Sequence, residues 1–128
     1  MKLFYFIFIA VALIWPASIQ AQETKNSARI SASYLYEVCK EDEEGKETVE
    51  GGHSACQAYI AGVVDYHNLL QSLGTSPSID ICVPESVNMN DLQDIVWRYL
   101  EANSHHDAFV AAPAVSLAIF EVFPCKKK

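Results

Sequence analysis

Apolar residues recur every three or four positions in four separate stretches of this chain, which is the spacing of one face of an α-helix. The clearest stretch, residues 54–73, is followed by Gly74, a residue type common at helix ends. Its apolar stripe consists of Cys56, Tyr59, Ile60, Val63, His67 and Leu70. Because such a stripe is stable only when it is buried, we expect this helix to lie against the rest of the domain.

The opposite side of the same helix carries a strip of small residues. Ala58, Ala61 and Gly62 form this strip, and Asp65 ends it. Small side chains would let another helix approach closely. We therefore expect Gly62 to serve a structural role at a helix contact, and Asp65 to cap or bridge a neighbouring element.

Three further helices are predicted. Residues 28–40 form the first, and Asn88 followed by Asp91 is a typical start for the third. The buried stripe of that third helix consists of Leu92, Ile95, Val96, Tyr99 and Leu100. The fourth covers residues 110–123, where Pro113 is tolerable only in the first turn.

The fourth helix is apolar on nearly all sides, since Ser116 and Glu121 are its only polar residues from position 114 onward. A helix of this kind must be buried on more than one side. The sequence shows no alternating strand pattern and no internal repeat. It therefore predicts an all-α domain at residues 22–128, a small bundle of four or at most five helices.

The first 21 residues have the features of a secretory signal peptide. Lys2 precedes an apolar run that ends at Trp15, and Pro16 and small residues follow as far as Ala21. A membrane anchor would need about 18 or more apolar residues, and this run is shorter. We expect export to the periplasm and cleavage after Ala21.

The remaining chain is acidic. The full sequence has 9 Lys plus Arg and 16 Asp plus Glu, and the segment removed contains one of the basic residues. This balance argues against nucleic acid or anionic lipid as a partner, and it favours a basic protein or a cationic surface.

Four cysteines lie in the mature part, at Cys39, Cys56, Cys82 and Cys125. An even number in a small exported chain is typical of a disulfide framework, for which three pairings are possible. We favour Cys39 with Cys56 and Cys82 with Cys125, because both bonds would join ends of helices that a small bundle brings together. The first bond would close a loop that contains four consecutive acids, residues 41–44, which we expect to be solvated.

Two other roles are conceivable for the first cysteine pair, a metal site and a redox pair. A zinc site at Cys39, His53 and Cys56 would need a fourth ligand and reduced thiols, which export makes improbable. A redox pair would prefer a spacing of two intervening residues, which is absent. The sequence therefore predicts no metal and no cofactor.

The four histidines do not form a recognisable catalytic signature. His67 falls on an apolar stripe, where a hydrogen-bonded core histidine is the favoured interpretation. His105, His106 and Asp107 lie in a polar turn and could bind a metal, but adjacent rings do not easily face one ion. We expect a protein that is not an enzyme.

Three phrases in the sequence resemble the Rap/Tai family of immunity proteins, which protect bacteria from type VI secretion amidase effectors. They are CQAYIAGVVD at 56–65, ICVPESVNMNDLQDIVWRYLEAN at 81–103, and VFPC at 122–125. The resemblance covers residues 34–125. It implies a periplasmic, all-helical homodimer that binds a cell-wall amidase and blocks its cleft without catalysis of its own.

The chain departs from the family pattern in the turn before the fourth helix. Ser104 stands where members often have proline, and Asp107 with Ala108 stands where they often have Arg-His. The target of the protein can therefore differ from those of its relatives.

We expect the third helix and the turn after it to bind the partner. The residues concerned are Asp94, Trp97, Arg98, Glu101, Asn103, Ser104, His105, His106 and Asp107. Trp97 with its charged neighbours resembles an interface anchor with a polar rim, although a tryptophan half-buried against the first helix fits equally well. The fourth helix favours a dimer contact because a four-helix monomer does not readily cover it.

Two other functions remain open at this point. One is a periplasmic acid-stress chaperone, a class that also has paired cysteines and a short helical core. The other is an enzyme that uses His105 or His106.

Overall fold

The computed structural model describes residues 29–75 and 77–126. The expected signal peptide and its cleavage site lie outside these residues. Within them the chain forms four α-helices and one 3-10 helix, and isolated bridges are the only β-structure. The elements are α1 Ala32–Cys39, α2 Gly52–Ser72, α3 Met89–Ala102, η1 Ser104–His106 and α4 Ala111–Val122. This confirms the predicted all-α bundle.

Helix α1 is shorter than the sequence pattern predicted. Ser31 caps it by accepting a hydrogen bond from the main-chain nitrogen of Tyr34. The residues before the cap are extended, because Ile30 accepts a hydrogen bond of 2.8 Å from the main-chain nitrogen of Ala111. Pairing with the start of α4 therefore replaces the helical start that we expected at residues 29–31, and residue 28 lies outside the described residues.

Helix α2 ends as its glycine indicated. Gly74 has a φ of 74°, the left-handed conformation that glycine adopts without strain. The main-chain nitrogen of Gly74 donates to the oxygen of Gln71, and that of Thr75 donates to Leu70. This pair of bonds is a Schellman motif, which satisfies two of the carbonyl groups left free at a helix end.

The start of α2 depends on a residue outside the helix. The carboxylate of Glu47 accepts hydrogen bonds of 3.0 Å from the nitrogen of Gly51 and 3.1 Å from that of His53. These two bonds are the main causes that lower the pKa of Glu47. Glu47 thus supplies the cap that the residue at the helix boundary, Gly51, cannot provide.

Helices α3 and α4 begin as predicted. Asn88 and Asp91 form a reciprocal capping box, with both hydrogen bonds at 3.1 Å. Pro113 is the third residue of α4, inside the first turn, where its missing N–H leaves no hydrogen bond unmade.

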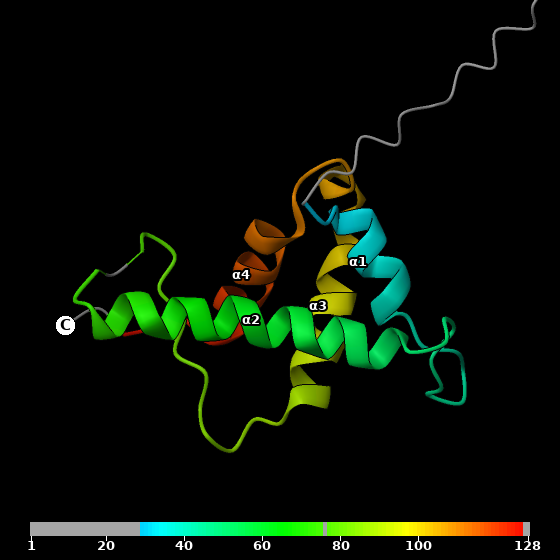
Figure 1. Ribbon diagram of the computed structural model, residues 1–128, viewed down its shortest axis with the longest axis horizontal. Helices are drawn as coiled ribbons and strands as arrows, with labels where there is room; N and C mark the ends of the chain where they lie inside the picture. The colour runs from blue at the N-terminus through cyan, green and yellow to red at the C-terminus, as the bar shows by residue number, and fades with distance from the viewer. Residues whose placement is uncertain (1–28, 76, 127–128) are drawn as a thin grey trace, which may run out of the picture.

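The core lies where α2 crosses the other three helices (Figure 1). Each helix contributes fully buried side chains, and the largest aliphatic ones are Leu35, Ile60, Val96, Val115 and Ile119. Helix α4 buries Ala111, Ala114, Val115, Ala118 and Ile119, whereas its other residues are partly or fully exposed. The described part of the chain therefore fully buries only one side of α4, although the sequence of this helix is apolar on nearly all sides.

Two disulfides fasten the ends of the helices. Cys39 is bonded to Cys56, which joins the end of α1 to the start of α2, and Cys82 is bonded to Cys125, which joins the loop before α3 to the segment after α4. This is the pairing that the sequence favoured. In the chain-entropy model, loops of 17 and 43 residues correspond to about 3 and about 4 kcal/mol of stabilisation.

Candidate partner-binding surfaces

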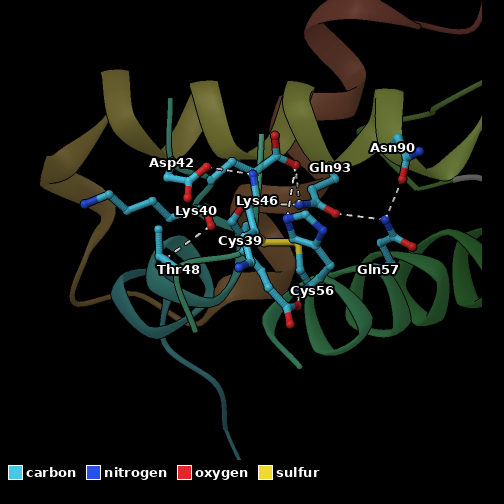
Figure 2. Close-up of polar contacts among 12 residues, drawn as sticks. Cys39, Lys40, Asp42, Lys46, Thr48, Cys56, Gln57, Asn90 and Gln93 are labelled. Atoms are coloured by element: carbon cyan, nitrogen blue, oxygen red, sulfur yellow. Dashed lines mark hydrogen bonds and ion pairs between the residues drawn. A yellow bond between two sulfur atoms is a disulfide. The ribbon is translucent and has the colours of Figure 1, made fainter. Parts of the chain in front are cut away.

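The loop between α1 and α2 is exposed but organised. Asp42 accepts hydrogen bonds from the main-chain nitrogens of Glu44 and Lys46, at 3.1 and 2.8 Å. The main-chain oxygen of Lys40 accepts one of 3.3 Å from the hydroxyl of Thr48 (Figure 2). The acidic loop is therefore folded on itself beside the first disulfide, a feature that its composition did not predict.

Behind this loop, a polar cluster links three elements. Gln93 of α3 is buried, and its Nε2 atom donates to the oxygen of Cys39 and to Oε1 of Glu41, at 3.2 and 3.1 Å. Its own Oε1 accepts a bond of 2.9 Å from Gln57, which also donates to Asn90 (Figure 2). A buried amide with all its groups paired fixes the register of α3 against α1 and α2.

His53 belongs to the same cluster. Its Nε2 atom is buried and lies 3.2 Å from Oε1 of Glu41. This contact is not a hydrogen bond in the structure, and it is an ion pair only when the imidazole is protonated. The cysteines beside it are bonded to each other, and no three His, Cys, Asp or Glu side chains in residues 29–75 and 77–126 are arranged to hold a metal ion.

His67 is a core histidine, as its place on the apolar stripe indicated. It is 5% exposed, and its Nε2 atom lies 3.1 Å from both Oδ1 of Asp80 and the main-chain nitrogen of Ile81. The atom accepts from Ile81 in one tautomer and donates to Asp80 in the other. Gln71 also donates to Asp80, at 2.7 Å. Together these bonds fix the loop after α2 onto that helix.

The predicted binding residues on α3 are mostly exposed. Asp94 and Arg98 are paired at 2.7 Å on the solvent side, and Glu101 is exposed near the end of the helix. Trp97 differs from them. It packs partly against the core, and its Nε1 atom is buried with no acceptor among the described residues. Its indole N–H is therefore inaccessible to a partner.

The turn between α3 and α4 is held by hydrogen bonds at both ends. It begins at Asn103, whose side chain donates to the oxygen of Tyr99 at 2.8 Å, and continues into η1. Its far side is tied to α1 by bonds from the main-chain nitrogen of Ala32 to the oxygen of Phe109 and from that of Ser33 to Asp107. The structure thus brings the predicted residues Asn103, Ser104, His105, His106 and Asp107 together in one place.

Aromatic rings gather on this turn. The ring of His106 lies 4.1 Å from that of His105, 5.8 Å from Phe109 and 5.9 Å from Tyr99, measured between centroids. Burial, and to a lesser extent the nearby charge of Glu121, raises the pKa of Tyr99, so its hydroxyl stays protonated. The polar turn that the sequence suggested is therefore a mixed aromatic and polar surface.

Phe109 is the residue at this turn that sequence reasoning missed. It is 61% exposed and borders a shallow apolar hollow of about 330 Å³. The hollow is lined by His106, Phe109, Val110, Pro113, Ala114 and Leu117. We call residues 103–110 together with this hollow the turn surface. The signal that could have revealed it is an aromatic residue placed just before a helix cap, where no helical face can bury it.

A larger groove of about 640 Å³ lies between α2, α4 and the loop at residues 77–79. It contains the predicted strip, since Ala58 and Gly62 line it. Asp65 is exposed, and its side chain makes no hydrogen bond or ion pair within the described part of the chain. The cap or bridge that we expected at Asp65 therefore does not occur among residues 29–75 and 77–126, and it stays a prediction.

The comparisons with known proteins agree with this architecture. The sequence model of the Rap1a immunity proteins matches residues 31–125, which include all four helices and both disulfides. The chain belongs to this family. Neither a search of curated proteins nor a search of solved structures gave a significant match.

Membership in the Rap1a family defines a broad role for the protein. Immunity proteins act by binding a cognate effector, and those of this family are generally not catalytic and typically periplasmic. No helix among residues 29–75 and 77–126 is both long and apolar enough to cross a membrane.

Proposed function

We propose that the protein is a periplasmic immunity protein that binds a peptidoglycan amidase of the type VI secretion system and covers its active-site cleft. Export would depend on the signal peptide at residues 1–21. The family assignment supports the general role. The observation that supports the turn surface as the effector contact is the exposed ring of Phe109, which lies beside an apolar hollow in a turn held by hydrogen bonds.

A protein that blocks a cleft needs a convex element that keeps its shape. The turn surface meets this need because hydrogen bonds hold it at both ends and in the middle, where the nitrogen of His106 donates to Asn103 at 2.8 Å and that of Phe109 donates to His106 at 2.8 Å. A pre-ordered loop loses little conformational entropy on binding. Phe109 would be the anchor, and the exposed Asp107 and Glu101 would form part of the polar rim.

The acidic character of the chain suits a basic target. The exposed acids near the turn would attract a cationic cleft and would raise the association rate more than the final affinity. This matches the general expectation from the net charge of −7.

The proposal includes a homodimer, as the resemblance to the Rap/Tai family implies. Each protomer would then present one turn surface, so that a dimer could bind two effector molecules.

The test is the binding and inhibition of candidate amidases. Purified protein is titrated with wall amidases, and protection is measured in cells that export the same amidase. We expect Phe109→Ala to weaken binding by about tenfold or more, as for a central aromatic anchor. The matched control is Val49→Ala, which removes an exposed apolar side chain from the loop between α1 and α2.

The proposal is wrong if no wall amidase binds or if cells gain no protection. If the two variants weaken binding equally, the amidase function survives, but the turn surface is not the contact.

A further inference from the structure

The outer face of α2 is uncovered and almost free of charge. Tyr66, Leu69 and Leu73 are 62%, 51% and 69% exposed, and they lie on the same side of the helix as the exposed Ala58 and Gly62. Asp65 is the only acid in the 21 residues of α2, which contain no lysine or arginine. The outward face of a surface helix is normally polar, so this face has the character of a buried one.

The groove beside this face is a built feature of the fold. Gly62, Val63 and Leu70 of α2 form one wall, Ala112 and Ser116 of α4 another, and Ile79 of the loop a third. The loop is held by the contacts of Asp80 with His67 and Gln71. The disulfide between Cys82 and Cys125 fixes the following residues. The groove is therefore present before any partner arrives.

Gly62 lies on this face without an internal reason to be glycine. A Cβ atom added there would meet no atom within 4 Å, and the residue does not have a positive φ. Glycine inside a helix is less stable than alanine. The sequence predicted a close helix approach at this strip, and the residues that the structure describes do not supply one at Gly62.

The charge distribution identifies the partner. The protein has a net charge of −7, and its acids are concentrated in the loop at 41–50 and on α3, so two copies repel each other through most of their surfaces. The outer face of α2 lacks this repulsion. Apart from Asp65, it also has no acid that would attract a cationic partner. The surface that matches it best is a second copy of the same face.

The face is long enough for two helices to cross on it, because the helix rises about 22 Å from Ala58 to Leu73. In a two-fold contact the same residues serve both copies, so two α2 helices can cross at Gly62. The exposed side chains of each copy would then lie against the groove of the other.

We propose that the outer face of α2 and the adjoining groove form a two-fold contact between two copies of this chain. The inference rests on the homodimer in the proposed function and assigns its surface. The groove and the hollow of the turn surface share Pro113, but none of residues 103–110, Phe109 included, lines the groove.

The experiment is sedimentation velocity on the full mature, oxidised protein at concentrations from about 1 µM to about 100 µM. The expected result is a dimer, and Gly62→Glu should raise its dissociation constant by about 100-fold, because two carboxylates then face each other at the crossing. The open space at Gly62 should leave the protomer folded, which circular dichroism checks. Val49→Glu adds the same charge on an exposed apolar residue elsewhere and should leave the dimer intact.

Three results would overturn the inference. They are a wild-type monomer over the whole concentration range, a Gly62→Glu protein that is still a dimer, and a monomer whose native mass includes a bound small molecule from the groove. If Gly62→Glu is unfolded, Leu69→Glu with Leu73→Glu tests the same face at exposed positions.

Effector binding is measured separately with the same proteins. A monomeric Gly62→Glu protein that still binds the amidase would support both proposals. If Gly62→Glu abolishes the dimer but neither the wild type nor the variant binds an amidase, the dimer contact is supported and the proposed function is refuted.

Discussion

Buried Gln93 of α3 donates a hydrogen bond of 3.2 Å to the main-chain oxygen of Cys39, the residue that ends α1 and carries the first disulfide. One amide thus connects α3 to the crosslinked junction of α1 and α2. Because the same side chain also bonds Glu41 and Gln57, its removal would leave several polar groups without partners.

Replacing this amide should be costly. We expect Gln93→Leu to lower the free energy of unfolding by about 1 to 3 kcal/mol, since a buried carbonyl and a carboxylate lose their donor. Urea denaturation measures the change. Asn90→Ala, which alters the exposed edge of the same cluster, should cost less than about 0.5 kcal/mol. If both variants lose the same free energy of unfolding, the buried hydrogen bonds of Gln93 do not stabilise the fold more than the exposed ones of Asn90.

The cap at Glu47 should make stability depend on pH in the acid range. Its folded pKa lies below the usual value of 4.5, so its contribution is present above pH 4.5 and is lost as pH falls through the lowered folded pKa. Glu47→Gln should therefore lower the melting temperature at pH 7, and the difference from wild type should shrink towards pH 3. Thermal unfolding at several pH values provides the test.

Glu43→Gln is the matched control for this prediction, because Glu43 is an exposed acid of the same loop. Its melting curve should follow that of the wild type across the range. A Glu47→Gln difference that is as large at pH 3 as at pH 7 would contradict the role of the carboxylate charge.

The two disulfides should be reduced in a fixed order. Cys39 and Cys56 are both 0% exposed, whereas Cys82 is exposed and Cys125 partly so. Thiol exchange requires access to a sulfur atom, so limited reduction should open the bond between Cys82 and Cys125 first. Alkylation of the freed thiols followed by peptide mapping would detect it. Labelled Cys39 appearing before labelled Cys82 would contradict the burial seen here.

The acids near the turn surface should control how fast an effector binds. Glu101→Gln combined with Asp107→Asn should slow association several-fold at about 20 mM salt and have little effect at about 500 mM, where charges are screened. Dissociation should change little. Arg98→Ala is a stability control. It should lower the free energy of unfolding by less than about 1 kcal/mol, because the pair of Asp94 with Arg98 is exposed.

The sequence predicted the features that depend on local order along the chain. Helix periodicity identified all four helices, and residue type located the stop at Gly74, the cap at Asn88 and the place of Pro113. His67 was recognised as a core residue because it lies on an apolar stripe. These signals were sufficient because each depends on neighbours within about one or two helical turns.

Features that depend on distant residues were missed. Gln93 looks like a surface residue until Cys39 and Gln57, more than 30 positions earlier, are brought to it. The start of α1 was misplaced because Ile30 pairs with Ala111 instead of continuing the helix. The sequence left the burial of Trp97 open and did not single out Phe109, because the exposure of an aromatic ring depends on the whole bundle.

Both crosslinks connect cysteines that are consecutive in the sequence, the first with the second and the third with the fourth. An oxidase that joined thiols in the order in which they emerged during translocation would therefore produce the native connectivity directly. Maturation of this polypeptide would then need a donor of oxidising equivalents but no isomerase to correct mispaired bonds.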